Sequence, residues 1–103
     1  MEQMHAPHLL DIEVVSALRR RLSADTLDLK RAEAALSAWR RIGLVRYPVV
    51  SHLERIWELR DNVTAYDATY VALAEALDCS LITADGRLSR APGIHCSITL
   101  VPR

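Results

Sequence analysis

The chain has few of the residues on which common cofactor-binding and nucleophilic motifs depend. It contains three glycines and no phenylalanine in 103 residues. Three glycines leave little room for the glycine-rich loops that bind dinucleotides or nucleoside phosphates, and no G-x-S-x-G sequence is present. The four histidines include no H-E-x-x-H pattern. We therefore do not expect nucleotide-cofactor chemistry or catalysis by a nucleophilic side chain.

Long apolar runs and an excess of charge are also lacking. No run approaches the ~18 to 20 apolar residues that a membrane span needs, and the polar opening MEQMHAPH does not resemble a signal peptide. We expect a soluble, cytoplasmic protein without membrane contact. Thirteen basic residues balance thirteen acidic ones, so the net charge gives no sign of a nucleic-acid binder.

Arginine dominates the basic residues, with a cluster at Arg19, Arg20 and Arg21. Arginine suits forked contacts with phosphate, but a solvated helix face or an acidic protein partner explains the cluster equally well. The two cysteines, Cys79 and Cys96, show no C-x-x-C spacing. We expect them to be buried free thiols.

The hydrophobic pattern alternates between helical and strand periods. Helices are predicted over residues 8–23, 26–43, 51–62 with Ser51 as the cap, and 64–77, with a short helical piece in 86–93. Strands are predicted over 44–49, 79–83 and 95–101. Helices between short apolar strands indicate an α/β domain with a mostly parallel sheet, and the lack of a linker predicts one domain over residues 1–103.

Two aspartates flank the most apolar part of the sequence. Asp67 follows Thr64 by three residues at the start of a predicted helix, where capping and the helix dipole account for an acid. The rest of this helix has few polar side chains, so we expect it to be buried, with Asp67 at the mouth of a covered region. Asp85 precedes Gly86 after a predicted strand. Asp-Gly favours a turn, yet ligands also bind at the carboxyl ends of parallel strands.

Glu13 lies at the border of an apolar stripe in the first predicted helix. No Arg or Lys stands three or four residues from it in the sequence, the spacing at which helices pair opposite charges. A carboxylate at this position suits a long-range arginine or a metal ion. Asp11, in the first turn of the same helix, is better explained by the helix dipole.

A sheet edge could bring Glu13, Asp67 and Asp85 together. Three neighbouring carboxylates repel one another unless a divalent cation neutralises them. Hard oxygen ligands suit Mg²⁺ or Mn²⁺, and such a site can activate water for attack on a phosphodiester. The alternative is that each acid has a structural role alone.

Three stretches of the sequence resemble the PIN-domain ribonucleases, and in particular the VapC toxins of bacterial toxin–antitoxin pairs: APHLLDIEVVSALRR, LRDNVTAYDATYVALAEALDCSLITADGRLSRAPG and CSITLV. The resemblance covers nearly the whole chain and implies a three-layer α/β/α fold. By motif, Glu13 matches the family's helix glutamate, Asp67 its helix-opening aspartate and Asp85 its post-strand aspartate, which bind Mg²⁺ or Mn²⁺ for RNA hydrolysis. Thr83 matches a hydroxyl residue often found two positions before the last acid.

The family pattern opens with a strand of the type hydrophobic-hydrophobic-D-x-S followed by a helix, and MEQMHAPHL aligns with the segment after them. We therefore expect the chain to lack a strand–helix unit of on the order of 30 residues, and with it the family's first metal-binding aspartate. An upstream start of the gene, a degraded relative, or a partner that supplies the strand would each account for this.

The leading hypothesis is a metal-dependent endoribonuclease toxin in which arginines steer the RNA. The alternative is a shortened, inactive PIN-like module that docks an antitoxin or a sister subunit, and a DNA-processing nuclease would share the same site. The resemblance further implies a VapB-like antitoxin as partner, an RNA substrate and a homodimer.

Overall fold

The chain forms two compact units, Met1–Tyr47 and Pro48–Arg103. The computed structural model describes residues 3–102. Met1, Glu2 and Arg103, which the predicted domain 1–103 also includes, lie outside the described residues. The prediction of a single domain stays a prediction.

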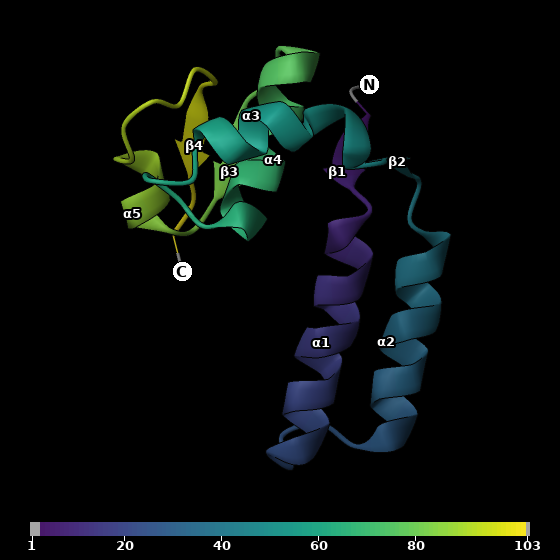
Figure 1. Ribbon diagram of the computed structural model, residues 1–103. Coiled ribbons are helices and arrows are strands. Elements are labelled where there is room, and N and C mark those ends of the chain that lie inside the picture. The colour runs from purple at the N-terminus through teal and green to yellow at the C-terminus, as the bar shows by residue number, and fades with distance from the viewer. Residues whose placement is uncertain (1–2, 103) are drawn as a thin grey trace. The chain divides into compact units, whose positions relative to one another are not determined.

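The first unit is a helical hairpin joined to a pair of parallel strands (Figure 1). Its elements are β1 (Met4–Pro7), α1 (Leu9–Ser23), α2 (Leu29–Arg41) and β2 (Leu44–Tyr47). Asp28 caps α2, because its side chain accepts a hydrogen bond of 2.8 Å from the backbone N–H of Arg31. The two helices and the second strand agree with the predicted elements.

No strand is predicted at β1, whose sequence MHAP shows no alternation of apolar and polar residues and ends in proline. The strand forms by pairing with β2, with Met4 opposite Leu44. The ladder is continued by the backbone N–H of His8, which donates to the carbonyl of Tyr47 at 2.9 Å. A partner far away in the sequence therefore creates this element, and local propensity does not.

The second unit combines short helices with a second pair of strands. Its elements are the 3₁₀ turn η1 (Val50–His52), α3 (Leu53–Glu58), α4 (Ala65–Leu77), β3 (Leu81–Thr83), α5 (Gly86–Ser89) and β4 (Ile98–Leu100). β3 and β4 pair in parallel with Leu81 opposite Ile98. Both pairings in the described chain are parallel, so the α/β arrangement with parallel strands is confirmed.

The core of the second unit is built around α4. Ala68 and Val71 of this helix are fully buried, and they pack with Leu59 and Leu88. Partly buried side chains from α3, β3 and the loop before β4 surround this cluster. The prediction that the apolar helix is buried is therefore confirmed.

The helix predicted over residues 51–62 is shorter in the structure, where both of its ends differ from the prediction. Ser51 lies within η1 and does not cap α3, whose first residue is Leu53. α3 ends at Glu58, because the N–H groups of Arg60 and Asn62 bond to carbonyls three residues back, which tightens the chain into turns. Residues 60–64 consequently form a loop that leads into α4.

The cysteines differ in exposure. Cys79 is exposed, so its predicted burial is wrong, because it lies just past the end of α4. Cys96 is half-buried against the core of the second unit, and this burial raises the pKa of its thiol.

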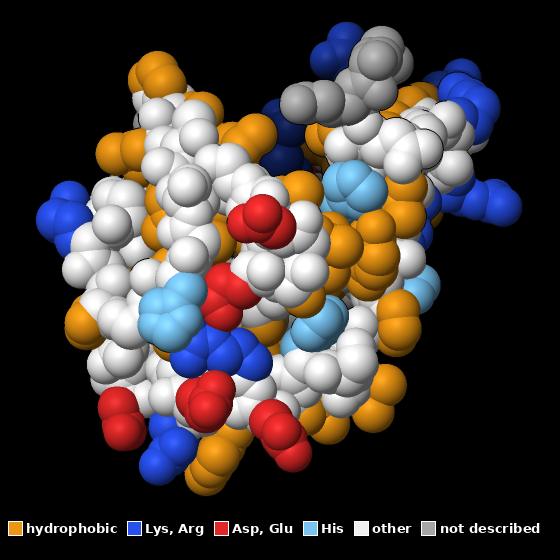
Figure 2. Space-filling view, turned by 90° about the horizontal axis from the view of Figure 1, so that it is seen from above, with side chains coloured by type: hydrophobic (Ala, Val, Ile, Leu, Met, Phe, Trp, Pro, Cys, Tyr) orange, Lys and Arg blue, Asp and Glu red, His pale blue; other side chains and the backbone are white. Residues whose placement is uncertain are grey.

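The surface mixes apolar and charged side chains, as the face in Figure 2 shows. Large hydrophobic side chains that remain exposed in the second unit include Val50, Leu53, Trp57 and Tyr66. Over residues 3–102, every helix is too short or too polar to cross a bilayer.

Candidate functional site

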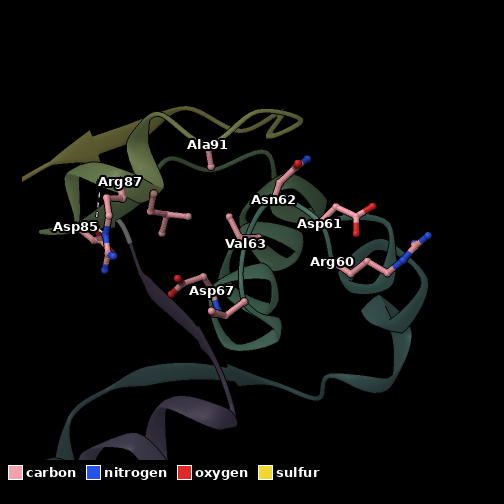
Figure 3. Close-up of a pocket in the computed structure, with 10 residues that line it drawn as sticks. Arg60, Asp61, Asn62, Val63, Asp67, Asp85, Arg87 and Ala91 are labelled. Carbon is pink, nitrogen blue, oxygen red and sulfur yellow. Dashed lines mark hydrogen bonds and ion pairs between the residues drawn. The ribbon is translucent and has the colours of Figure 1, made fainter.

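Asp67 lies in the first turn of α4, where Thr64 holds the backbone. The backbone N–H of Asp67 donates to the Thr64 hydroxyl oxygen at 3.1 Å, so Thr64 is the cap that the sequence predicts. The Asp67 side chain is half-buried and projects from α4 into a pocket (Figure 3). The cap thus fixes the point from which this carboxylate emerges.

Asp85 lies two residues after the end of β3 and is the N-terminal cap residue of α5. Its Oδ1 atom accepts a hydrogen bond of 2.9 Å from the backbone N–H of Arg87 and lies 3.7 Å from the Arg87 Nε atom. Its own backbone N–H donates to the Thr83 hydroxyl oxygen at 3.1 Å. Thr83 therefore orients the turn that carries Asp85, which gives this residue a positioning contact.

Both aspartates line one open pocket of about 490 Å³ in the second unit (Figure 3). The two carboxylates come from different elements, the start of α4 and the cap of α5 that follows β3. The lining consists of Arg60, Asp61, Asn62, Val63, Thr64, Asp67, Asp85, Arg87, Leu88 and Ala91. Acidic residues and two arginines, Arg60 and Arg87, therefore line the same pocket.

Glu13 belongs to the first unit, where it is half-buried in the middle of α1. The structure thus brings two of the three predicted acids, Asp67 and Asp85, to one pocket. Within either unit, over residues 3–102, no three His, Cys, Asp or Glu side chains gather closely enough to hold a metal ion. Of the three predicted metal ligands, the second unit therefore provides two, the carboxylates of Asp67 and Asp85.

Asp61 and the two pocket arginines are not singled out by sequence reasoning. Asp61 is exposed at the rim of the pocket, in the loop between α3 and α4 (Figure 3). Its position depends on where α3 ends, which the sequence pattern misplaces. The sequence does contain a weak indication for Arg87, because this residue directly follows the Asp85-Gly86 pair that predicts a turn at the end of a strand.

Asp11 lies in the first turn of α1, as expected, but its partners come from farther along the chain. Its carboxylate accepts hydrogen bonds from Arg46 Nε at 2.8 and 3.0 Å and from Trp39 Nε1 at 2.7 Å. These bonds lower the pKa of the Asp11 carboxyl group, and those from Arg46 have the largest effect. The cluster joins α1 to α2 and β2, and it borders a second hollow of about 320 Å³.

Arg55 and Glu75 form the other strong ion pair, in the second unit. Arg55 Nε lies 2.7 Å from Glu75 Oε1, and the other Glu75 oxygen accepts from the backbone N–H of His95 at 2.7 Å. Arg55 also donates to the carbonyl of Gly93 at 2.6 Å. The pair therefore ties α3 and α4 to the loop before β4.

Comparison with known proteins agrees with this architecture. The family model for the PIN domain matches residues 1–94. A VapC ribonuclease of Mycobacterium bovis and Ribonuclease VapC9 of Mycobacterium tuberculosis are each 55% identical over 102 residues, which cover 99% of this chain and 80% of theirs. Ribonuclease VapC1 of Mycobacterium tuberculosis is 53% identical over 98 residues, 94% of this chain and 74% of its own.

The match extends through both compact units, and it includes the capped start of α4 and the turn after β3 that carry the pocket aspartates. One family model and several relatives thus agree over nearly the whole sequence. The chain therefore belongs to the PIN-domain family, as a VapC-like member.

Proposed function

We propose that this protein is an endoribonuclease toxin that hydrolyses RNA phosphodiesters with Mg²⁺ or Mn²⁺ in the pocket of Asp67 and Asp85. The observation that carries the proposal is that these two carboxylates, which come from separate elements, line the same open pocket. Two relatives that match 99% of the chain are named as ribonucleases, which supports RNA as the substrate.

The donor groups present suit the proposed cation. Mg²⁺ prefers hard oxygen ligands and is often held through one or two carboxylates while it keeps several waters. Asp67 and Asp85 would hold it, and the family resemblance adds Glu13 of α1 as a third ligand. When bound, the ion supplies charge neutralisation and an activated water for hydrolysis.

Other residues of the pocket position these groups and bind the substrate in this proposal. Thr83 and the Arg87 backbone fix Asp85 from two sides. Arg60 and Arg87 are among the residues that line the pocket, and their guanidinium groups would bind phosphate oxygens of the RNA. An acidic pocket alone would repel a polyanion, so these cations would lower the cost of bringing a phosphate to the site.

The remaining parts of the proposal follow from the family. We propose a VapB-like antitoxin as partner, a homodimer as the assembled form, and action in the cytoplasm. Copurification of the chain with the product of an adjacent antitoxin gene would test the first. Light scattering of the purified protein would test the second.

Replacing either pocket aspartate tests the catalytic assignment. Asp67→Asn and Asp85→Asn each remove a charge and keep the shape, and we expect RNA cleavage to fall by about 100-fold or more, because even outer partners of metal ligands contribute about 10- to 100-fold. Cleavage of a labelled RNA in Mg²⁺ or Mn²⁺ is the measurement.

Asp78→Asn is the matched control for these variants. Asp78 is exposed at the opposite end of α4 in a left-handed conformation that asparagine also adopts. If both pocket variants cleave RNA as fast as this control, the two aspartates have structural roles and the proposal fails.

One observation favours a second candidate, a PIN-like module that binds an antitoxin or a sister subunit without cutting RNA. Within either unit of the described chain, no three His, Cys, Asp or Glu side chains lie close enough together to hold a metal ion. Calorimetric titration with Mn²⁺ separates the two candidates. A nuclease site should bind the ion saturably and lose this binding in Asp67→Asn, whereas the inactive module should show no such binding.

A further inference from the structure

Trp57 is a large apolar side chain on the surface of the second unit. It lies in α3, and 67% of its side chain is exposed. Tryptophan is usually well buried or part of a binding surface, because its large ring is costly to leave in water. Its exposure therefore suggests a flat ligand or a partner.

Arg60 connects Trp57 to the pocket. Its guanidinium carbon lies 4.7 Å from the centroid of the Trp57 ring, a cation–π contact, and it also donates to the Trp57 carbonyl at 3.0 Å. Arg60 lines the same pocket as Asp67 and Asp85 (Figure 3). Arg60 thus contacts the Trp57 ring and is also one of the residues that line the pocket.

We propose that Trp57 and Arg60 form a stacking site for an unpaired nucleobase of an RNA strand. Proteins that bind single-stranded RNA stack bases on aromatic rings and on guanidinium planes, and they add positive charge for the backbone. Trp57 offers the ring, and Arg60 offers both a plane and a charge. This inference rests on the proposed function, because it assumes that RNA enters the pocket.

Continuity with the pocket favours RNA over a protein partner. A strand with a phosphate near Asp67 and Asp85 could extend along the pocket to Arg60, which lines the pocket and also contacts the Trp57 ring. The alternative uses Val50 and Leu53, which are exposed before Trp57 along η1 and α3 and extend an apolar stripe. Such a stripe would suit a second copy of the chain.

Two RNA probes separate base stacking from charge. One is a short fluorescein-labelled oligoadenylate, and the other is a strand of the same length whose sugar–phosphate backbone carries no bases. Binding is measured by fluorescence anisotropy in the Asp67→Asn background, which under the proposed function does not cut the probe. The wild-type stacking site should bind oligoadenylate more tightly than the strand without bases.

Trp57→Ala should weaken binding of oligoadenylate by roughly 5- to 150-fold, the loss that accompanies removal of one base–aromatic stack. It should leave binding of the strand without bases unchanged. Trp57→Phe, which keeps an aromatic ring, should retain most of the affinity. Equal losses for the two probes, or no loss for either, would overturn the inference.

Leu53→Ala is the matched control, because Leu53 lies in the same short helix and is 55% exposed. It should bind both probes as the parent does. Light scattering on Leu53→Ala and Trp57→Ala tests the alternative, and conversion of a dimer to a monomer by both variants would assign the stripe to an interface between copies and overturn the RNA site.

A spectroscopic measurement does not depend on the Ala variant folding. In Trp39→Phe, the remaining tryptophan is Trp57, and oligoadenylate should quench its fluorescence while the strand without bases should not. Absence of quenching at saturation would contradict the stacking site. RNA cleavage by the wild-type protein is measured separately. Base stacking without cleavage would contradict the proposed function alone, and cleavage without a role for Trp57 would contradict the stacking site alone.

Discussion

Asp11 and Glu75 accept short hydrogen bonds from arginine side chains, Asp11 from Arg46 and Glu75 from Arg55. In each, these bonds lower the pKa of the carboxyl group against the opposing effect of partial burial. Glu75 is the more enclosed, with 14% of its side chain exposed, and it also accepts a bond from the backbone. A charge held this way contributes to stability only while it stays ionised.

Glu75→Gln should lower the free energy of unfolding by about 2 kcal/mol, because the change leaves the Arg55 guanidinium without its charged acceptor in a place where 25% of that side chain is exposed. Urea denaturation measures the effect. Glu58→Gln is the control, because Glu58 contacts the same arginine at 3.5 Å but is 64% exposed, and it should cost less than about 0.5 kcal/mol. Equal effects of the two variants would show that Glu75 has no special role.

The same pair predicts a dependence on pH. The pKa of Glu75 is lowered below its ordinary value of 4.5 by the bond from Arg55. Its contribution is therefore complete above pH 4.5 and is lost as the pH falls through the lowered folded value. The stability difference between wild type and Glu75→Gln, followed by urea denaturation, should be constant near neutrality and shrink on acidification. A difference that widens in acid would contradict this sign.

At the scale of elements, helix α4 positions the site because its first turn is fixed by one side chain. Thr64 accepts the hydrogen bond from the Asp67 backbone, and the fully buried Ala68 follows directly. The capping residue thus lies between the exposed loop and the core. Any loosening of this turn would shift the origin of the Asp67 carboxylate.

Thr64→Ala should destabilise the protein by about 1 kcal/mol, the usual effect of removing a capping side chain. Thr64→Ser keeps the hydroxyl group and should remain close to the wild type in a denaturant titration. A Ser variant as unstable as the Ala variant would mean that packing of the threonine methyl, and not the cap, provides the stabilisation.

The other elements show which signals the sequence carries. The helix Leu9–Ser23 has a helical apolar stripe and the helix Ala65–Leu77 is apolar on most faces, and both agree with prediction. The helix predicted over 51–62 is shorter than expected because turns with tighter hydrogen bonds take over after Glu58. Strand β1 is absent from the prediction because its partner β2 lies elsewhere in the sequence.

At the scale of the whole molecule, the chain divides into two compact units with their own strand pair and helices. One tryptophan lies in each unit, Trp39 in the first and Trp57 in the second. The family model spans both units. This distribution provides a direct test of the predicted single domain.

If the units fold as one domain, unfolding should be a single cooperative transition. In Trp39→Phe and in Trp57→Phe, the fluorescence of the remaining tryptophan reports on one unit, while far-ultraviolet circular dichroism reports on the helices of both. The two signals should give the same urea midpoint within each variant. Separate midpoints would show that the units unfold independently and that the single-domain prediction is wrong.

The sequence by itself determined the helices Leu9–Ser23 and Ala65–Leu77, the capping role of Thr64, and the choice of Asp67 and Asp85 as candidate residues. Each of these depends on residues that are neighbours in the chain, where period and spacing act directly. Only the tertiary structure decided that these two aspartates share a pocket with Arg60 and Arg87. It also paired Arg55 with Glu75 and β1 with β2, because contacts between distant residues depend on the whole folded backbone and leave no fixed spacing in the sequence.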